Sequence, residues 1–205
     1  SSTNYGSEWN TLRIDSGLTG LPRQDKPYIA IDNRPSGGNL YVAWTPNLDE
    51  NLTQTEIRLA RSTDGGTHWS SVLLDEASNP MAGDLMLAMS TKPVVVSQSQ
   101  NPDVAPLHFV EFAMPAVGPG GEVYVSWTDN FDYRPFPQVY ESSWIKIAKS
   151  TDGGASFPFV QNVARFTFNE DHAGPMRIFT NPSLAVDQRT GYVYVAYKDA
   201  KSDAD

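Results

Sequence analysis

No cysteine occurs among the 205 residues of this chain. The absence excludes disulfide bonds, cysteine-ligated zinc sites and thiol catalysis. Small secreted eukaryotic domains usually depend on disulfides, so a chain without cysteine fits a prokaryotic secreted protein, or a cytosolic one, better. The sequence begins with Ser1, which is expected when a secretion signal has been removed. We therefore expect a prokaryotic protein that is secreted or displayed on the cell surface.

Basic charge and long apolar runs are also scarce. The chain has 15 Lys and Arg against 24 Asp and Glu, which gives a net charge of −9 at pH 7. Nucleic acids and anionic membranes repel such a chain, so neither is expected as a partner. No apolar run approaches the roughly 18 residues of a membrane helix, which argues against membrane insertion. Helical patterns are nearly absent: residues 81–89 are the best candidate, and residues 93–97 predict an extra strand.

The sequence contains an eight-residue motif that occurs twice. The first motif, at residues 62–69, reads STDGGTHW, and the second, at residues 150–157, reads STDGGASF. Alternating polar and apolar residues on both sides of each motif predict two strands joined by a tight turn. The paired glycines supply the positive φ angles of such a turn, and the Asp accepts backbone N–H groups across it. The terminal aromatic ring is expected to lie under the hairpin.

These motif residues are therefore expected to hold a turn together rather than to perform chemistry. The residues assigned this structural role are Ser62, Asp64, Gly66, Trp69, Ser150, Asp152, Gly154 and Phe157.

A longer repeat surrounds the motifs. It consists of two short strands joined by a turn rich in Gly, Asn, Asp or Pro. Its three copies are residues 27–32 with 37–44, residues 116–121 with 122–127, and residues 182–187 with 191–197. Each full unit therefore predicts four antiparallel strands, with the motif in the last turn.

Both motifs fit the pattern Ser-x-Asp-x-Gly-x-(Ser/Thr)-(Trp/Phe), which resembles the Asp-box, or BNR repeat, of sialidase-like β-propellers. The resemblance extends over nearly the whole chain and implies an all-β fold of four-stranded antiparallel blades. It implies about two and a half blades of a six- or seven-bladed ring. The expected domain is a single partial propeller over residues 1–205. Its expected parts are a first blade at about 27–75, an inter-blade insertion at about 76–108, a second blade at about 109–162 and the start of a third blade at about 178–205. Either a longer parent chain or several copies of this chain would complete the ring.

The resemblance also places a ligand at the end of the blades away from the motifs. The loop at residues 128–136 there combines carboxylates, aromatic rings and an arginine, which suit contact with a glycan. The candidate ligand-binding residues are Asp129, Asp132, Tyr133, Arg134, Arg23 and Arg177. A solvated loop that packs on the neighbouring blade is the alternative interpretation. Glu170, Asp171 and His172 form a second acidic cluster that invites an acid–base interpretation.

Sialidases of this family clamp a carboxylate with three arginines and use a Tyr/Glu nucleophile pair and an Asp acid. In this chain Arg23 lies in the region of the first of these arginines, but the Pro-containing motif of the family is absent there. Arg177 lies in a sequence that resembles the motif but lacks the Pro. The catalytic residues are therefore unassigned, and whether the chain is an enzyme stays open.

Three functions remain at this stage. The first is a module that binds glycan or protein without catalysis. The second is an exo-α-sialidase-like glycoside hydrolase with part of its site outside this chain. The third is a structural module that self-associates through open blade edges. No cofactor is required by any of them. Acidic loop residues could hold a structural calcium ion; the candidates are Asp49, Asp129, Asp132, Asp199 and Asp203.

Overall fold

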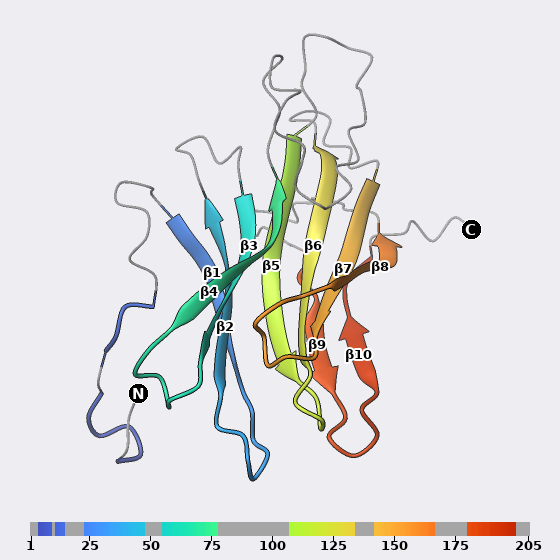
Figure 1. Cartoon of the computed structure of the whole chain (residues 1–205). Coiled ribbons are helices and arrows are strands. Elements are labelled where there is room, and N and C mark those ends of the chain that lie inside the picture. Colours follow the sequence, from blue (N-terminus) through green and yellow to red (C-terminus); the bar gives the residue numbers. More distant parts are fainter. Residues whose placement is uncertain are drawn as a thin grey trace.

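The computed structural model describes residues 4–9, 11–14, 23–47, 55–77, 107–133, 142–166 and 180–199. Within these residues the secondary structure is entirely β, with strands β1 to β10 and no helix (Figure 1). The expected all-β class is therefore confirmed. The helix expected at residues 81–89 and the strand expected at 93–97 lie outside the described residues.

The strands form two four-stranded sheets and one hairpin, all antiparallel. The first sheet consists of β1 (Arg23–Ile31), β2 (Leu40–Asn47), β3 (Thr55–Ser62) and β4 (Ser70–Ala77). The second sheet consists of β5 (Leu107–Val117), β6 (Val123–Tyr133), β7 (Ser142–Ser150) and β8 (Phe159–Phe166). The third sheet is the hairpin of β9 (Ser183–Val186) and β10 (Val193–Ala196). In every sheet the strands stand side by side in the order of the chain.

Strand β6 is longer than the sequence suggested. A loop was expected from residue 128, but β6 runs to Tyr133. The extension is held from both sides, because Asn130 pairs with Phe109 of β5 and with Ser143 of β7. A strand with hydrogen-bonding neighbours on both edges satisfies its backbone groups despite a polar sequence.

The two motifs form the β3–β4 and β7–β8 turns, and their glycines have positive φ as predicted. The φ angles are 71° and 93° at Gly65 and Gly66, and 68° and 81° at Gly153 and Gly154. Asp64 Oδ1 accepts the N–H groups of Thr67 and His68 at 3.0 and 2.9 Å. The sequence of the motif thus supplies both the backbone freedom and the acceptor that the turn requires.

The second motif repeats this geometry. Asp152 Oδ1 accepts the N–H groups of Ala155 and Ser156 at 3.0 and 2.9 Å. The hydroxyl of Ser150 donates to Asp152 Oδ1 at 2.7 Å and accepts the N–H of Gly154 at 2.8 Å. Hydrogen bonds to the ionised carboxyl lower the pKa of Asp152, chiefly through the Ser156 and Ser150 hydroxyls. The pKa of Asp64 is lowered in the same way, chiefly through His68 and then Ser62.

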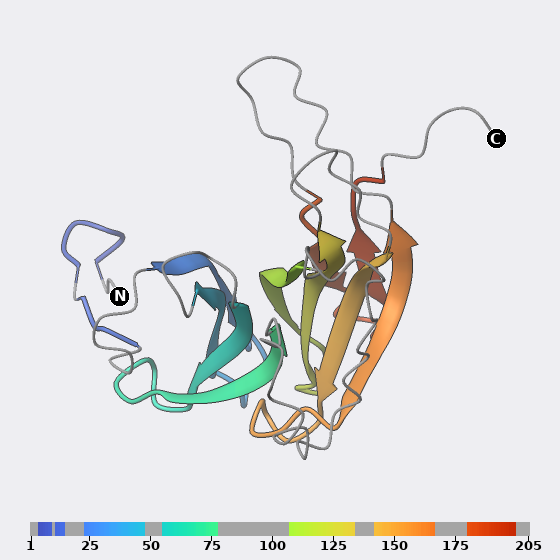
Figure 2. The same cartoon turned by 90° about the horizontal axis from the view of Figure 1, so that it is seen from above.

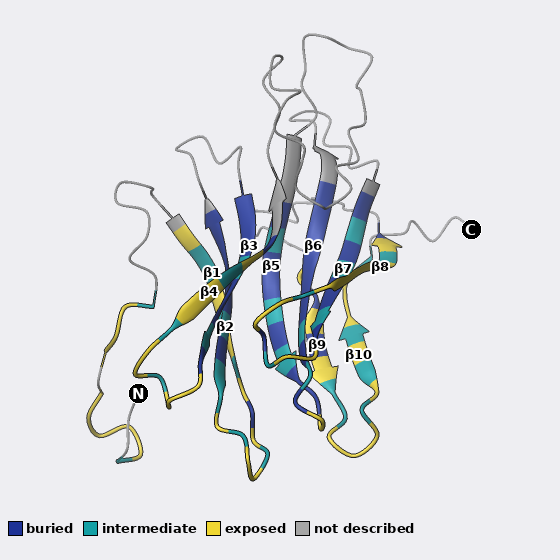
Figure 3. Cartoon of the chain, in the orientation of Figure 1, coloured by how far each residue is buried: buried dark blue, intermediate teal, exposed yellow. Residues whose placement is uncertain are grey.

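The main core lies between the first and second sheets (Figure 2). Strand β5 lies at the centre, since it contacts all four strands of the first sheet and also β9. Figure 3 shows buried residues following β2, β3 and β6, whereas β4 and β8 are largely exposed or intermediate. The fully buried side chains of this core include Tyr41, Ile57, Leu59, Val125 and Trp127. The hairpin covers the other face of the second sheet, where Val195 packs on Ile145 and Phe166.

Polar contacts join neighbouring sheets at the end that carries the motifs. Arg34 is held by Asp32 and donates through Nη1 to the carbonyl of Gly120 at 2.7 Å, from the first sheet to the second. Arg61 Nη1 donates to the carbonyl of Gly153 in the second motif at 3.1 Å. These donors satisfy turn carbonyls of the neighbouring sheet, so each turn is fixed by the sheet beside it.

The strand register shows that the first two strands of the three sheets are copies of one unit. In each copy an alanine of the first strand pairs with a tyrosine of the second: Ala30 with Tyr41, Ala116 with Tyr124, and Ala185 with Tyr194. This register makes the three tyrosines equivalent positions.

Candidate functional site

The sheets have two chemically different ends. The two motifs lie at one end, towards the bottom of Figure 1. At the opposite end, here called the loop end, β1 and β5 begin and β2 and β6 finish (Figure 1). The loop end carries one group of charged residues at the junction between the first and second sheets.

An acidic and a basic residue of β1 meet a carboxylate of β5 at this junction. Lys26 Nζ lies 2.5 Å from Asp25 Oδ2 and 3.7 Å from Glu111 Oε2. About a quarter of the Lys26 and Glu111 side chains and 45 % of the Asp25 side chain remain exposed. We call Asp25, Lys26 and Glu111 the loop-end cluster. It offers solvent two carboxylates as acceptors and one ammonium as donor.

The backbone at the loop-end cluster is strained. Lys26 and Phe112 have φ angles of 53° and 62°, in the left-handed region that side chains other than glycine rarely adopt. Both residues lie where the strand register shifts, in β1 and in β5. The Lys26 ammonium lies 4.5 Å from the centre of the Phe112 ring, an attractive cation–π contact. Strain of this kind concentrates at functional sites, because surrounding structure must hold it in place.

The repeat explains why the two bulges meet. Asp25 pairs with Thr45 of β2, and Glu111 pairs with Thr128 of β6, so the two carboxylates occupy equivalent positions in consecutive sheets. The Thr128 hydroxyl donates to the backbone carbonyl of Glu111 at 3.2 Å, which fixes the β5 bulge from within its own sheet. The first and second sheets therefore each present one acidic side chain at this end.

Two further ion pairs lie on β3 and between β6 and β7. Arg58 Nε donates to Glu56 Oε2 at 2.6 Å on β3, and Lys146 of β7 forms an ion pair with Asp129 of β6. Arg58 and Lys146 are also equivalent, since they pair with the tryptophans Trp44 and Trp127. Asp129 is only 7 % exposed. Its carboxylate is therefore neutralised within the second sheet.

Buried oxygen atoms without a hydrogen-bond partner also occur in this part of the structure. They are Thr45 Oγ1, Asn130 Oδ1, Ser143 Oγ and Ser126 Oγ. Asn130 and Ser143 pair directly across β6 and β7 near the loop end. Buried polar atoms in folded proteins nearly always have a partner, often an ordered water molecule or a ligand group. Because these oxygen atoms are buried within the sheets, they are not presented to solvent at the loop end.

The structure places the sequence-predicted ligand residues as follows. Asp129 is buried and paired with Lys146. Asp132 and Tyr133 lie in the last part of β6 and Arg23 is the first residue of β1, but the structure describes only their backbone. Arg134 and Arg177 lie outside the described residues.

Other residues that the sequence suggested for a site also fall outside the described part of the chain: Asp49, Asp203 and the cluster at residues 170–172. Asp199 is described. No group of three metal-ligating side chains occurs among the described residues. The calcium site stays a prediction.

Sequence reasoning missed Glu111, Phe112 and Lys146. A signal for Glu111 was present, because it stands alone as a charge in the apolar run Leu107–Val117 and aligns with Asp25 in the repeat. The positive φ of Phe112 had no sequence signal, since no glycine or asparagine marks it.

A shallow pocket of about 180 Å³ lies beside the first motif, lined by Arg61, Asp64, His68 and Trp69 among others. Its polar groups are used within the turn: His68 Nδ1 lies 2.6 Å from Asp64 Oδ2, and Trp69 Nε1 donates to the carbonyl of Gly66. We therefore assign this pocket to the structure of the turn.

No protein-family model matches the chain, and no curated protein matches it either. None of the described residues forms a helix of the length and apolarity needed to cross a membrane.

Proposed function

We propose that this chain is a carbohydrate-binding module of the sialidase-like β-propeller type, with its ligand at the loop end. The observation that carries the proposal is the loop-end cluster, where Asp25, Lys26 and Glu111 from two sheets converge on strained backbone. Carboxylates accept hydrogen bonds from sugar hydroxyls and an ammonium donates to them, so this set matches a polyhydroxylated ligand.

The arrangement of the sheets supports the propeller part of the proposal. The first and second sheets are four-stranded meanders and the third is a two-stranded hairpin. The sheets stack face to face in the order of the chain. Their first strands lie together, β1 beside β5 and β5 beside β9 (Figure 2). The Asn181 amide, which precedes β9, also donates to the Tyr28 hydroxyl of β1 at 3.1 Å. First strands that converge in this way are expected of blades around an axis.

The proposal concerns binding and includes no catalysis. The sialidase alternative depends on Arg23, Arg134 and Arg177, whose side chains the structure does not describe. The described carboxylates of the loop-end cluster are engaged with Lys26. Engagement of this kind suits hydrogen bonding to a neutral sugar.

The test uses two lysines that each lie over an aromatic ring. Lys26 lies over Phe112 at the loop end, and Lys149 lies 5.5 Å from the centre of the Tyr124 ring near the second motif. We expect Lys26→Met to weaken glycan binding by about 10-fold or more, the loss of one charge-assisted hydrogen bond of about 1.5–3 kcal/mol. Lys149→Met makes the same chemical change at the other end and should leave binding unchanged.

Binding would be measured on an array of neutral and sialylated oligosaccharides and then by calorimetry with the best probe. Circular dichroism of both variants reports whether the fold is retained. An array without any retained glycan would overturn the proposal, as would equal losses in the two variants.

A further inference from the structure

We infer that the third sheet docks onto the first sheet of a second copy of this chain, so that copies associate head to tail. The inference goes beyond the proposed glycan site and rests on the other end and the flat faces of the sheets. It begins from an interface that already exists within the molecule, between the first and second sheets.

In that internal interface a tyrosine of the first sheet lies against the motif of the second. Tyr41 is 1 % exposed. A Cβ placed on Gly154 would lie 3.0 Å from the Tyr41 ring and 3.4 Å from Leu59, so any larger residue would press on the ring. Arg61 secures the same turn through the carbonyl of Gly153. The contact is thus a tyrosine ring seated on the Gly-Gly turn of the next sheet.

The tyrosine of this contact recurs on the third sheet, where it is exposed. Tyr194 occupies the position of Tyr41, paired with the alanine of the preceding strand. Whereas Tyr41 is buried, Tyr194 is 56 % exposed and its neighbour Tyr192 is 67 % exposed. We call Tyr194 of β10 and Tyr192, which directly precedes this strand, the tyrosine face.

The Gly-Gly turn of this contact also recurs, on the first sheet. Gly66 occupies the position of Gly154 in the motif, but the nearest atoms to a Cβ there belong to Leu40 and Trp69 of its own sheet. On the same sheet, Ile29 and Ile31 are 63 % and 47 % exposed. We call Ile29, Ile31 and the exposed Leu73 the isoleucine face. In the second sheet the position of Ile31 is taken by Val117, which is 8 % exposed because the first sheet covers it.

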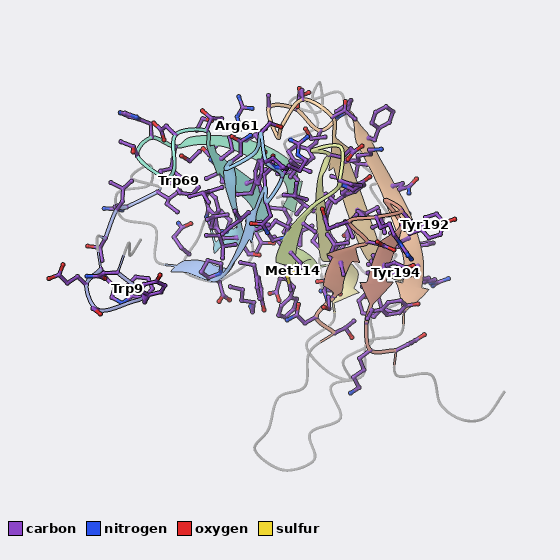
Figure 4. All side chains as sticks on the ribbon, turned by 90° about the horizontal axis from the view of Figure 1, so that it is seen from below. Trp9, Arg61, Trp69, Met114, Tyr192 and Tyr194 are labelled. Atoms are coloured by element: carbon purple, nitrogen blue, oxygen red, sulfur yellow. The ribbon has the colours of Figure 1, made fainter. Side chains whose placement is uncertain are left out.

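The two faces are therefore complementary halves of an interface that the molecule already uses once. Figure 4 shows Trp69 and Tyr194 on opposite sides of the molecule, so one copy cannot satisfy both faces by itself. A second copy presents its isoleucine face and first motif to the tyrosine face of the first. Such a heterologous contact generates an open chain or a closed ring.

Burial of apolar surface drives the association of two copies, and the like net charge of the copies opposes it. The net charge of −9 repels a second copy at low salt. Raising the ionic strength from about 0.02 to 0.3 M shortens the Debye length to below 10 Å, so association should strengthen with salt.

Analytical ultracentrifugation of the whole chain at several concentrations tests the inference. We expect assemblies larger than a monomer, which Tyr194→Asp and Ile31→Asp each reduce to monomers. Phe159→Asp is the matched control, because Phe159 is an equally exposed aromatic residue, at 61 %, on the outer strand β8. It should assemble like the unchanged chain.

A mixture of the two disrupted variants makes the test specific. Tyr194→Asp retains an intact isoleucine face and Ile31→Asp an intact tyrosine face, so an equimolar mixture should form dimers and stop there. A chain that stays monomeric at all concentrations and salts would overturn the inference. So would a mixture that forms no dimer, or a Phe159→Asp variant that also fails to assemble.

Discussion

At the scale of single residues, the aspartates of the two motifs, Asp64 and Asp152, each accept several hydrogen bonds. Each accepts two backbone N–H groups and the hydroxyl of the first serine of its motif, and Asp152 also accepts the hydroxyl of Ser156. These bonds favour the ionised form, so the pKa of both carboxyls lies below the ordinary value of about 4. Ionisation and folding are therefore linked at both turns.

This linkage predicts the acid response of the chain. A folded-state pKa below the unfolded value contributes stability above the unfolded pKa, which is lost as the pH falls through the folded pKa. We expect Asp152→Asn to lower the melting temperature at pH 7 and to flatten its fall between about pH 5 and 2. Thermal unfolding at pH 7, 5 and 3 measures both effects. Glu8→Gln, a carboxylate outside the motifs, controls for net charge, and an unaltered pH slope in Asp152→Asn would contradict the prediction.

At the scale of the elements, sequence reasoning recovered the two motif turns and the strands beside them and missed the bulges. The motif residues predicted their turns because glycine and aspartate have distinct backbone preferences, and Gly65 and Gly154 adopt positive φ as those preferences require. The bulges at Lys26 and Phe112 left no such trace, since tertiary contacts impose a conformation that these residue types disfavour. The end of β6 was also missed, because pairing with both neighbours overrides a polar local sequence.

The motif turns allow backbone strain to be separated from contact with the neighbouring sheet. Gly65 and Gly154 both have positive φ, but a Cβ on Gly65 meets no atom within 4 Å, whereas one on Gly154 meets Tyr41. Gly65→Ala should cost about 1–2 kcal/mol from strain alone. Gly154→Ala should cost more, by roughly 1–3 kcal/mol of overpacking. Urea unfolding of the two variants gives the difference, and equal costs would show that Tyr41 moves aside freely.

At the scale of the whole molecule, Trp127 joins the first and second sheets. Its side chain is fully buried in the core that both sheets share. We expect Trp127→Ala to lower the free energy of unfolding by about 3–5 kcal/mol, as loss of a buried aromatic residue does. The matched control is Trp9→Ala, at a side chain that is 70 % exposed, with an effect within about 0.5 kcal/mol. Denaturant titration followed by circular dichroism measures both, and similar losses would mean that the sheets do not depend on their shared core.

The order of the strands has a consequence for how the protein is made. Every pairing within a sheet joins strands that are neighbours along the chain, so each sheet requires only its own segment. Domains and their parts emerge from the ribosome from the N-terminus, at about 5–20 residues per second. The first sheet can therefore be complete while Trp127 is still unmade, and the inner face with Tyr41 and Leu59 then remains bare for several seconds. The same repeated geometry that lets one sheet cover the next leaves each new sheet exposed until its successor has been synthesised.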